Sequence, residues 1–325
     1  MSTSVMTPKQ RAIAALTLQQ PDQVPTFELE FQLEKEVFGC DFFPKELRGD
    51  SVHLLSPLEQ EKHVRKLAED MAHVYGSMEY CILPAHYCSA WHVTGAFDGR
   101  KLLMKHLREL MGDNCLYGDH ADGTFSIPDG NRMYDFVYEI ADDPDSVHER
   151  AKKMMENAIE ENKRRVEAGV DLGYMCSDYC YNSGPFLSPD MFAQFVTPYL
   201  AKIVEEAKKA GMYVIKHTDG DIMPILDQLV ECKPHALHSL DPMAGVDIKQ
   251  VKEMVGDKVA LCGNVNCSFL QTGTDAELIE SAEYCMTHGM KNGGYIYCTS
   301  NVPFKGINPD RYMMILDVWK RMRNY

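Results

Sequence analysis

Two histidines and two cysteines stand at the ends of short apolar runs in the second half of the chain. They are His217 in MYVIKHTDGD, His238 in HALHSLD, Cys262 in KVALCGN and Cys298 in YIYCTSN. Thiolate sulfur and neutral imidazole nitrogen are ligands that zinc prefers, and a catalytic zinc site keeps three protein ligands and one exchangeable position. The sequence therefore predicts a zinc site held by His217, Cys262 and Cys298, with the fourth position open to water or substrate.

Other interpretations of the same residues stay open. A buried cysteine in a strand usually serves packing alone, and a histidine such as His238 that faces a neighbouring strand is usually a hydrogen-bonded core residue. If His217 points away from the metal, the carboxylate of Asp219 or Glu277 is the expected replacement ligand. Each carboxylate also has a structural explanation, because Asp219 and Asp221 can cap a helix and Glu277 is the last residue of the capping box TDAE.

Parallel strands are the elements that would bring these side chains together. Each of the four runs has the length of a buried strand and is followed by a segment with helical periodicity, which is the βαβ pattern of a parallel sheet. The carboxyl ends of such strands form the rim where α/β barrels keep their active sites. Four further strands are predicted in the first half of the chain, at residues 24–31, 78–83, 132–140 and 170–176.

Helix signals separate these strands. Capping residues, capping boxes and prolines predict helices at 8–18, 57–75, 144–169 and 189–211, and further helices that begin at 275 and 309. With the eight strands they predict an α/β fold, a (β/α)8 TIM barrel formed by a single domain over residues 1–325. The stretch 85–129 is the least regular, and we assign it to loops and short helices over the barrel mouth.

The composition sets outer limits on function. The chain has 325 residues, 45% of them hydrophobic, and a formal net charge of −15, which disfavours nucleic acid and anionic membranes as partners. No run approaches the roughly 20 apolar residues of a membrane span, and residues 1–20 lack the pattern of a secretory signal. The 11 cysteines are an odd number spread over a large domain, so we expect reduced thiols and a cytoplasmic protein.

Five segments of the chain carry a resemblance to a known family: KQRAIAALTLQQPDQVP, SDYCYNSGPFLSPDMF, HTDGDIMPILDQL, LDPMAGVDIKQVKEMVGDKVALCGNV and GGYIYCTSN. They look like the uroporphyrinogen decarboxylase superfamily, across most of the chain. The resemblance implies a (β/α)8 barrel. It leaves the reaction open, since the superfamily contains both decarboxylases of porphyrinogens and zinc-dependent methyltransferases of corrinoid systems.

The substrate receptor of the decarboxylase branch is missing here. Decarboxylases of the superfamily carry an arginine-rich motif near the amino end that holds the substrate's carboxylates, and bidentate carboxylate binding needs guanidinium groups. The corresponding stretch, TFELEFQLEKEVFG, has no arginine and places Glu28, Glu30 and Glu34 there instead. We therefore expect no porphyrinogen decarboxylation.

The methyltransferase branch fits the chain with one departure. Its zinc ligands are a His-x-Cys pair and a distant cysteine, which fall on His217, Asp219 and Cys298, so an aspartate stands where the nearer cysteine is expected. The chain therefore resembles related methyltransferases that demethylate methyl ethers such as methoxy-aromatic compounds, some of which take ligands at the positions of Cys262, Cys298 and Glu277. The resemblance implies that the methyl acceptor is the cobalt of a corrinoid (cobalamin) on a separate partner protein.

Cleavage of an ether C–O bond needs positive charge or a proton at the departing oxygen, which zinc or a general acid supplies. We expect His217 and Asp219 to act in catalysis. Substrate contacts are expected from side chains at the barrel mouth, namely Glu28, His86, Asp178, Tyr181, Asn182, His238, Asn264 and Asn301.

Two other functions compete with methyl transfer. One is a metal-free decarboxylase or lyase of a small acid, with His217 and Asp219 as acid and base. The other is a non-catalytic barrel that binds a corrinoid or tetrapyrrole. The sequence does not fix the oligomeric state; a homodimer is the assembly to test first, because twofold dimers are the commonest closed oligomers.

Overall fold

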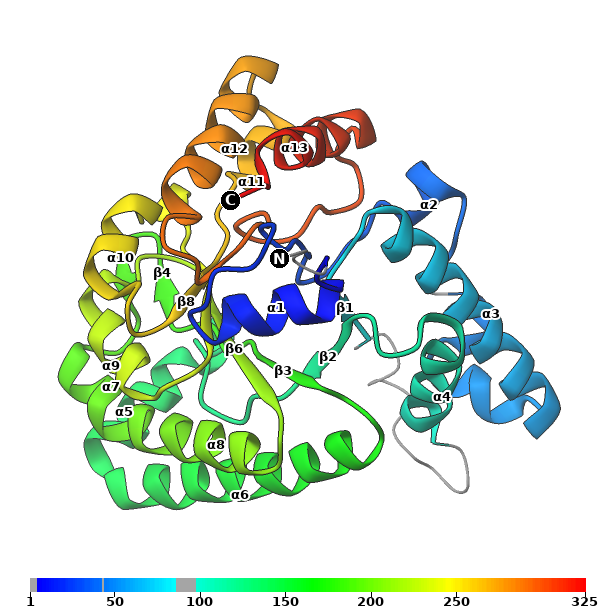
Figure 1. Cartoon of the computed structure of the whole chain (residues 1–325). Helices are drawn as coiled ribbons and strands as arrows, with labels where there is room; N and C mark the ends of the chain where they lie inside the picture. Colours follow the sequence, from blue (N-terminus) through cyan, green and yellow to red (C-terminus); the bar gives the residue numbers. More distant parts are fainter. Residues whose placement is uncertain (1–4, 43, 86–97) are drawn as a thin grey trace.

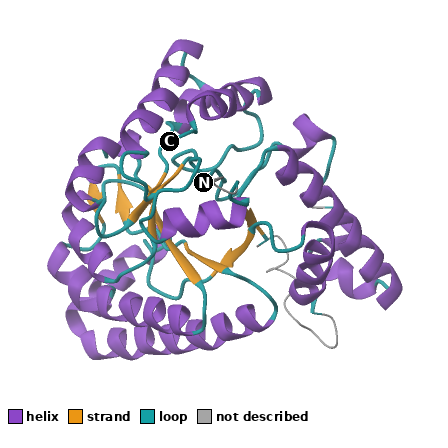
Figure 2. Cartoon of the chain, viewed as in Figure 1, coloured by secondary structure: helices purple, strands orange, loops and turns teal. Residues whose placement is uncertain are grey.

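A seven-stranded parallel sheet forms the centre of the protein in the computed structural model, which describes residues 5–42, 44–85 and 98–325. The strands pair in chain order, and every neighbouring pair is parallel. Helices surround the curled sheet (Figure 1), so that the strands lie at the centre of the molecule (Figure 2). The strands of this sheet are β1 (Ile82–Pro84), β2 (Leu116–His120), β3 (Leu172–Met175), β6 (Tyr213–Thr218), β7 (Ala236–Ser239), β8 (Ala260–Cys262) and β9 (Tyr295–Ile296).

Helices precede, separate and follow these strands along the chain. They are α1 (Pro8–Leu16), α2 (Glu34–Phe38), α3 (Pro57–Ser77), α4 (Gly99–Met111), α5 (Met133–Asp142), α6 (Pro144–Glu167), α7 (Pro189–Phe195), α8 (Thr197–Lys209), α9 (Leu226–Glu231), α10 (Ile248–Val255), α11 (Cys267–Gln271), α12 (Asp275–Gly289) and α13 (Pro309–Met322). A short antiparallel hairpin, β4 (Cys180–Tyr181) and β5 (Gly184–Pro185), follows β3. Within the described residues, no helix combines the length and apolar character that crossing a membrane would require.

The segment around Thr26 takes the eighth position of the barrel. Thr26 forms a parallel bridge with Tyr297, just after β9, and the Tyr297 N–H donates to the Pro25 carbonyl at 2.9 Å. On its other side, the Cys81 N–H, just before β1, donates to the Thr26 carbonyl at 2.9 Å. The strand predicted at 24–31 is therefore present as a short extended segment that joins the two edges of the sheet, and the TIM-barrel prediction is confirmed.

Most predicted elements are found where the local signals place them. The predicted capping boxes that begin at Ser56 and Thr274 are both formed, with reciprocal hydrogen bonds between the N-cap residue and the glutamate three residues on. The helix predicted at 189–211 is divided into α7 and α8 at Val196. Pro198 occupies the first turn of α8, where a residue without an N–H is tolerated but could not continue α7.

The strand predicted at 132–140 is wrong, because these residues form a short turn and helix α5. Met133, Phe136, Val137 and Ile140 have the spacing i, i+3, i+4, i+7, which is helical rather than alternating. The third barrel strand is instead β2, inside the stretch 85–129 that we assigned to loops and short helices. Its Gly118 is required by packing, since a Cβ there would lie 2.5 Å from the Tyr174 ring.

Glu28 anchors the closure of the barrel. Its side chain is buried, accepts hydrogen bonds from the Thr299 N–H at 3.2 Å and the Tyr312 hydroxyl at 3.2 Å, and is hydrogen-bonded to the Thr299 hydroxyl at 2.5 Å. Burial raises the pKa of Glu28 to about 8, and the hydrogen bonds from Thr299 and Tyr312 offset only part of that effect. Glu28 therefore keeps its proton at neutral pH and links the first barrel position to the loop after β9.

The stability of the protein should fall as Glu28 is forced to ionise. The folded-state pKa of about 8 lies above the ordinary 4.5, so between these values the unfolded chain loses the proton while the folded chain retains it. The free energy of unfolding should therefore decrease with rising pH in this window, by about 1.4 kcal/mol per unit at most from this group. Urea unfolding of wild type and Glu28→Gln at several pH values between 5 and 8.5 measures this, and parallel curves would contradict it.

Candidate functional site

Three side chains converge at the carboxyl rim of the barrel. His217 and Asp219 come from the end of β6 and the loop after it, and Asp178 comes from the loop after β3. The His217 Nε2 atom lies 3.7 Å from an oxygen of each carboxylate. Among the described residues, this is the one group of three or more histidine, cysteine, aspartate or glutamate side chains whose ligand atoms all lie within 4.8 Å of one another.

His217 is neutral and shares a hydrogen bond with His238. The Nδ1 atoms of the two rings are 2.7 Å apart, and burial lowers the pKa of His217 to about 3 and that of His238 well below its ordinary value. The Thr299 backbone favours the protonated form of His238, as a carbonyl acceptor does. One hydrogen lies between the two Nδ1 atoms; when His217 supplies it, the His217 Nε2 carries a lone pair and the His238 proton lies on its Nε2.

This tautomer points the Nε2 lone pair of His217 at two carboxylates. Burial and the nearby Asp178 charge together raise the pKa of Asp219 to about 7, against the hydrogen bonds from Ser239 and Asn301. Three lone-pair donors that face one another repel unless a proton or a cation lies between them. A metal-bound histidine usually donates its other N–H to a partner, as His217 does to His238. The cluster therefore has the donor set of a divalent metal site.

The predicted cysteine ligands do not join this cluster. Cys262 and Cys298 are fully buried in the hydrophobic core, and burial raises the pKa of both thiols well above the ordinary value. Their sulfurs are not grouped with His217, so the predicted trio is not assembled, whereas the predicted substitute Asp219 lies beside His217. The other substitute, Glu277, is bound as the cap of α12 by the Thr274 N–H at 2.7 Å.

Asp219 is held by its backbone and by a neighbouring loop. Its N–H donates to Asp178 Oδ1 at 3.1 Å, and the Asn301 side chain donates to Asp219 Oδ2 at 2.6 Å. The following residue, Gly220, has φ +82°, and a Cβ there would lie 2.5 Å from the Cys180 carbonyl oxygen. Only glycine allows this turn to pack against β4, so the turn fixes the direction of the Asp219 carboxylate.

The other predicted contact residues have different environments. Tyr181 and Asn182 are exposed in the β4–β5 hairpin, where the Tyr181 ring packs edge-on against Phe186. Asn264 serves the fold, because it donates to two backbone carbonyls and accepts from the Cys285 thiol. Glu28 is buried against Thr299 and Tyr312 as described above, and His86 lies outside the described residues. Asp221 caps the turn after β6 by accepting from the Met223 N–H.

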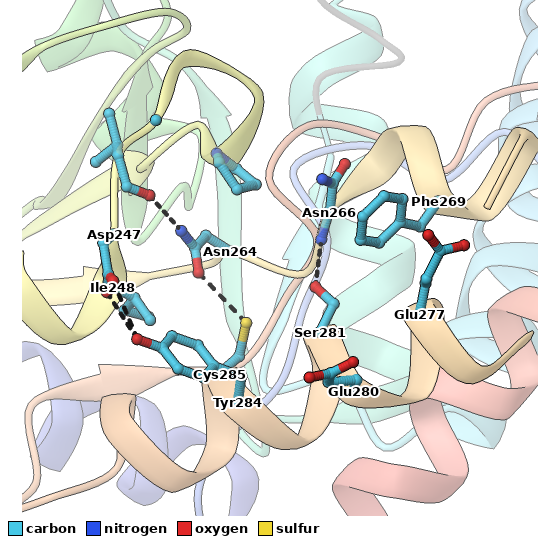
Figure 3. Close-up of a pocket in the computed structure, with 13 residues that line it drawn as sticks. Asp247, Ile248, Asn264, Asn266, Phe269, Glu277, Glu280, Ser281, Tyr284 and Cys285 are labelled. Atoms are coloured by element: carbon cyan, nitrogen blue, oxygen red, sulfur yellow. Dashed lines mark hydrogen bonds between the residues drawn. The ribbon is translucent and has the colours of Figure 1, made fainter. Parts of the chain in front are cut away.

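A pocket of about 390 Å³ is lined by the loops after β7 and β8, the start of α10 and one side of α12 (Figure 3). Asp247, Tyr284 and Asn264 line it, and the Tyr284 hydroxyl donates to both Asp247 oxygens at 3.1 and 3.0 Å. No member of the Asp178, His217 and Asp219 cluster lines this pocket. We therefore define the candidate site by the cluster of Asp178, His217 and Asp219 rather than by this pocket.

The sequence profile for uroporphyrinogen decarboxylase (URO-D) matches residues 129–321. The chain belongs to the URO-D family. A methyltransferase from Methanosarcina mazei has the same fold, with a TM-score of 0.73 and 17% identity over 97% of this chain and 99% of that one. A protein from Sinorhizobium meliloti 1021 reaches a TM-score of 0.45 at 12% identity over 79% and 93% of the two chains, which is too weak to support an argument. Comparison with curated proteins gives no match.

A buried lysine that sequence reasoning missed supports the rim of this URO-D barrel. Lys216 precedes His217 in β6 and is fully buried. Its ammonium donates to Asp122 Oδ2 at 2.9 Å and to the carbonyls of Met175 at 3.0 Å and Ser177 at 2.9 Å. A lysine inside an apolar strand is itself a signal, because lysine is rarely buried without a partner.

Asp122 completes this support. It accepts from the Ser177 N–H at 3.0 Å and from the Thr124 N–H at 2.9 Å. Burial alone would raise the pKa of Asp122, but the charge and hydrogen bond of Lys216 outweigh burial and lower that pKa to about 2. The ion pair therefore ties the loop after β2 to the loop after β3 that carries Asp178.

Removing the ammonium should destabilise the protein strongly. Lys216→Met leaves the Asp122 carboxylate buried and without its counter-charge, which we expect to lower the free energy of unfolding by roughly 3–5 kcal/mol. Urea unfolding at neutral pH measures this. The matched control is Lys202→Met on α8, which breaks a partly exposed pair with Glu206 and should cost about 1 kcal/mol or less. Equal losses in the two variants would contradict the role of Lys216.

Proposed function

We propose that this URO-D family member is a methyltransferase that moves a methyl group from a small methylated substrate, with methoxy-aromatic compounds as the preferred class, to the cobalt of a corrinoid on a partner protein. The observation that carries the proposal is the group of lone-pair donors at the barrel rim, Asp178, His217 and Asp219. The missing arginines in TFELEFQLEKEVFG argue against a polycarboxylate substrate.

A divalent metal, zinc in our proposal, fits these three residues. His217 would contribute Nε2, and Asp219 and Asp178 would each contribute a carboxylate oxygen, which are donors found in zinc sites with an open position. When bound there, the metal would supply positive charge to the ether oxygen as the methyl group leaves. The chain's own part is to hold the imidazole in the required tautomer through His238 and to aim Asp219 through Asn301.

The fold supports the same proposal by analogy. The Methanosarcina mazei protein that shares the fold is a methyltransferase. Because one fold can carry many functions, this likeness supports methyl transfer only by analogy, and the site residues carry the argument. The acceptor would reach the rim from outside, so we place the corrinoid on a separate protein that docks over the barrel mouth and aligns cobalt with the methyl group.

A metal-free lyase of a small acid remains the second candidate. The observation in its favour is Asp219, whose pKa near 7 lets it give or take a proton at neutral pH. His217 is less suited to the acid role that this mechanism assigns, because its pKa of about 3 leaves it without an imidazolium proton to give at neutral pH. Metal content therefore separates the two candidates.

The direct test combines a methyl-transfer assay with metal analysis. The protein is incubated with a reduced corrinoid protein and methoxyphenols, and methyl-cobalt formation is followed by visible absorbance. We expect turnover and close to one zinc per chain, since the donors form one site. Absence of turnover with methoxyphenols, methanol, methylamines and methyl thioethers would contradict the proposal, and turnover of a small acid without metal would favour the lyase.

The ligand assignment is tested with variants in the same assay. His217→Ala and Asp219→Asn should lose bound zinc and turnover, because loss of a ligand costs more than the roughly 10–100-fold that follows loss of an outer partner. Cys262→Ser and Cys298→Ser are the comparison. Zinc and activity retained in the cysteine variants support the aspartate site, and zinc lost only in the cysteine variants would restore the ligand set expected from sequence.

A further inference from the structure

A chain of hydrogen bonds runs from the first barrel position to the candidate site. Glu28 contacts the backbone N–H and the hydroxyl of Thr299. The Thr299 hydroxyl also lies 3.0 Å from the Asn301 carbonyl oxygen, and the Asn301 side chain donates to Asp219 at 2.6 Å. Hydrogen bonds thus connect four residues from three separate parts of the barrel, one after another. The last of them, Asp219, is a proposed metal ligand.

The direction of the hydrogens follows from simple counting. The Thr299 hydroxyl has one hydrogen and two oxygen neighbours, Glu28 Oε2 at 2.5 Å and the Asn301 carbonyl at 3.0 Å. Both contacts are hydrogen bonds only if Glu28 carries a proton and donates it to the hydroxyl, which then donates to Asn301. Burial keeps that proton on Glu28. Four ionisable groups interact electrostatically with Glu28. Each has a raised pKa and is uncharged at neutral pH; they are Cys267, Tyr297, Cys298 and Tyr312.

The hydrogen bonds between Glu28 and Thr299 are buried, so no other group in the described part of the chain takes the place of either partner. Thr299 is fully buried and Glu28 is 1% exposed, so water cannot replace either partner. If Glu28 were apolar, the buried Thr299 N–H would lose the only acceptor that the structure gives it within the described residues. The loop from Thr299 to Asn301 would then be free to find another arrangement, and the Asn301 amide would no longer be aimed at Asp219.

We propose that Glu28 is a positioning residue of the Asp219 site, which acts through Thr299 to hold Asn301 against the Asp219 carboxylate. Glu28 itself does not touch the reacting atoms. This inference rests on the proposed function only for the identity of the metal that Asp219 helps to bind; the positioning of Asn301 is independent of it.

The test measures Asn301 directly and the metal separately. The side-chain amide signals of Asn301, assigned with Asn301→Ala, are followed by two-dimensional nitrogen–proton NMR, and Co²⁺ affinity is measured by titration of visible absorbance. The variants are Glu28→Leu, which removes the link, Glu28→Gln, which can donate to the Thr299 hydroxyl and accept from its N–H, and Thr299→Val. Tyr312→Phe is the matched control, because it removes another Glu28 contact at 3.2 Å without touching the link to Asn301.

We expect the Asn301 amide signals to move in Glu28→Leu and Thr299→Val, to remain in place in Tyr312→Phe, and to be restored in Glu28→Gln. Co²⁺ binding should weaken by about tenfold or more where the signals move, as for other outer-shell partners of metal ligands. If Glu28→Leu does not fold, Thr299→Val carries the comparison. Because a purely structural role for Glu28 would lower stability in Tyr312→Phe as well, the Asn301 signal separates the two roles.

Two other outcomes are decisive. Unchanged Asn301 signals in folded Glu28→Leu or Thr299→Val would overturn the inference, whatever the metal affinity. Shifted Asn301 signals in a protein whose wild type binds no Co²⁺ would support the positioning role and would instead contradict the proposed metal function.

Discussion

The rim of this barrel depends on one buried charge. The Lys216 ammonium lies in the interior, where an unpaired charge is too costly to keep, so the structure must bring acceptors to it. These acceptors are Asp122 and the backbone carbonyls of Met175 and Ser177. Asp122 lies in the loop after β2, Met175 ends β3 and Ser177 lies in the loop after β3. One side chain of β6 therefore determines where two neighbouring loops sit. Asp178 follows Ser177 directly, and its place beside His217 is a consequence of that arrangement.

A second constraint acts on the opposite face of the same strand. Side chains alternate along a strand, so Lys216 and His217 point in opposite directions. His217 is buried against His238, and two buried imidazoles stay neutral because neither can be solvated as a cation. A neutral pair has one hydrogen in its mutual contact, and when His217 supplies it, a lone pair remains on the far side of His217. The Asp178 and Asp219 oxygens at 3.7 Å face this lone pair, so the fold itself creates the need for a bound proton or cation.

The sequence predicted the frame of the protein better than its site. Local signals are strong where side chains cap their own helix, as at Ser56 and Thr274, or where an apolar run ends in a polar residue, as at His217. They gave the wrong element at α5, whose apolar residues were assigned to a strand. They also missed β2, a short strand whose Gly118 leaves room for the Tyr174 ring.

The predicted cysteine ligands lie apart from His217 for a different reason. Cys262 and Cys298 stand at strand ends in the sequence, yet the direction of a side chain at a strand end depends on register and packing that no local pattern reports. The His217–Asp219 pair could be recognised because two residues of spacing i, i+2 at the end of a strand share a face. The contributions of Asp122, Lys216 and Asn301 arise from contacts between distant parts of the chain, separated by 94 residues for Lys216 and Asp122 and 82 for Asn301 and Asp219.

The aspartate at position 219 has a chemical consequence for the proposed reaction. Thiolates are soft ligands that donate much electron density to a metal, whereas carboxylates are harder and donate less. A metal held by one imidazole and two carboxylates would therefore keep more of its positive charge for a fourth ligand. That charge suits an ether oxygen, which is a poor leaving group and a weak donor, better than a thiol, which needs only to be deprotonated. In the proposed reaction, the carboxylate beside His217 would thus favour oxygen-bound methyl groups as the substrate.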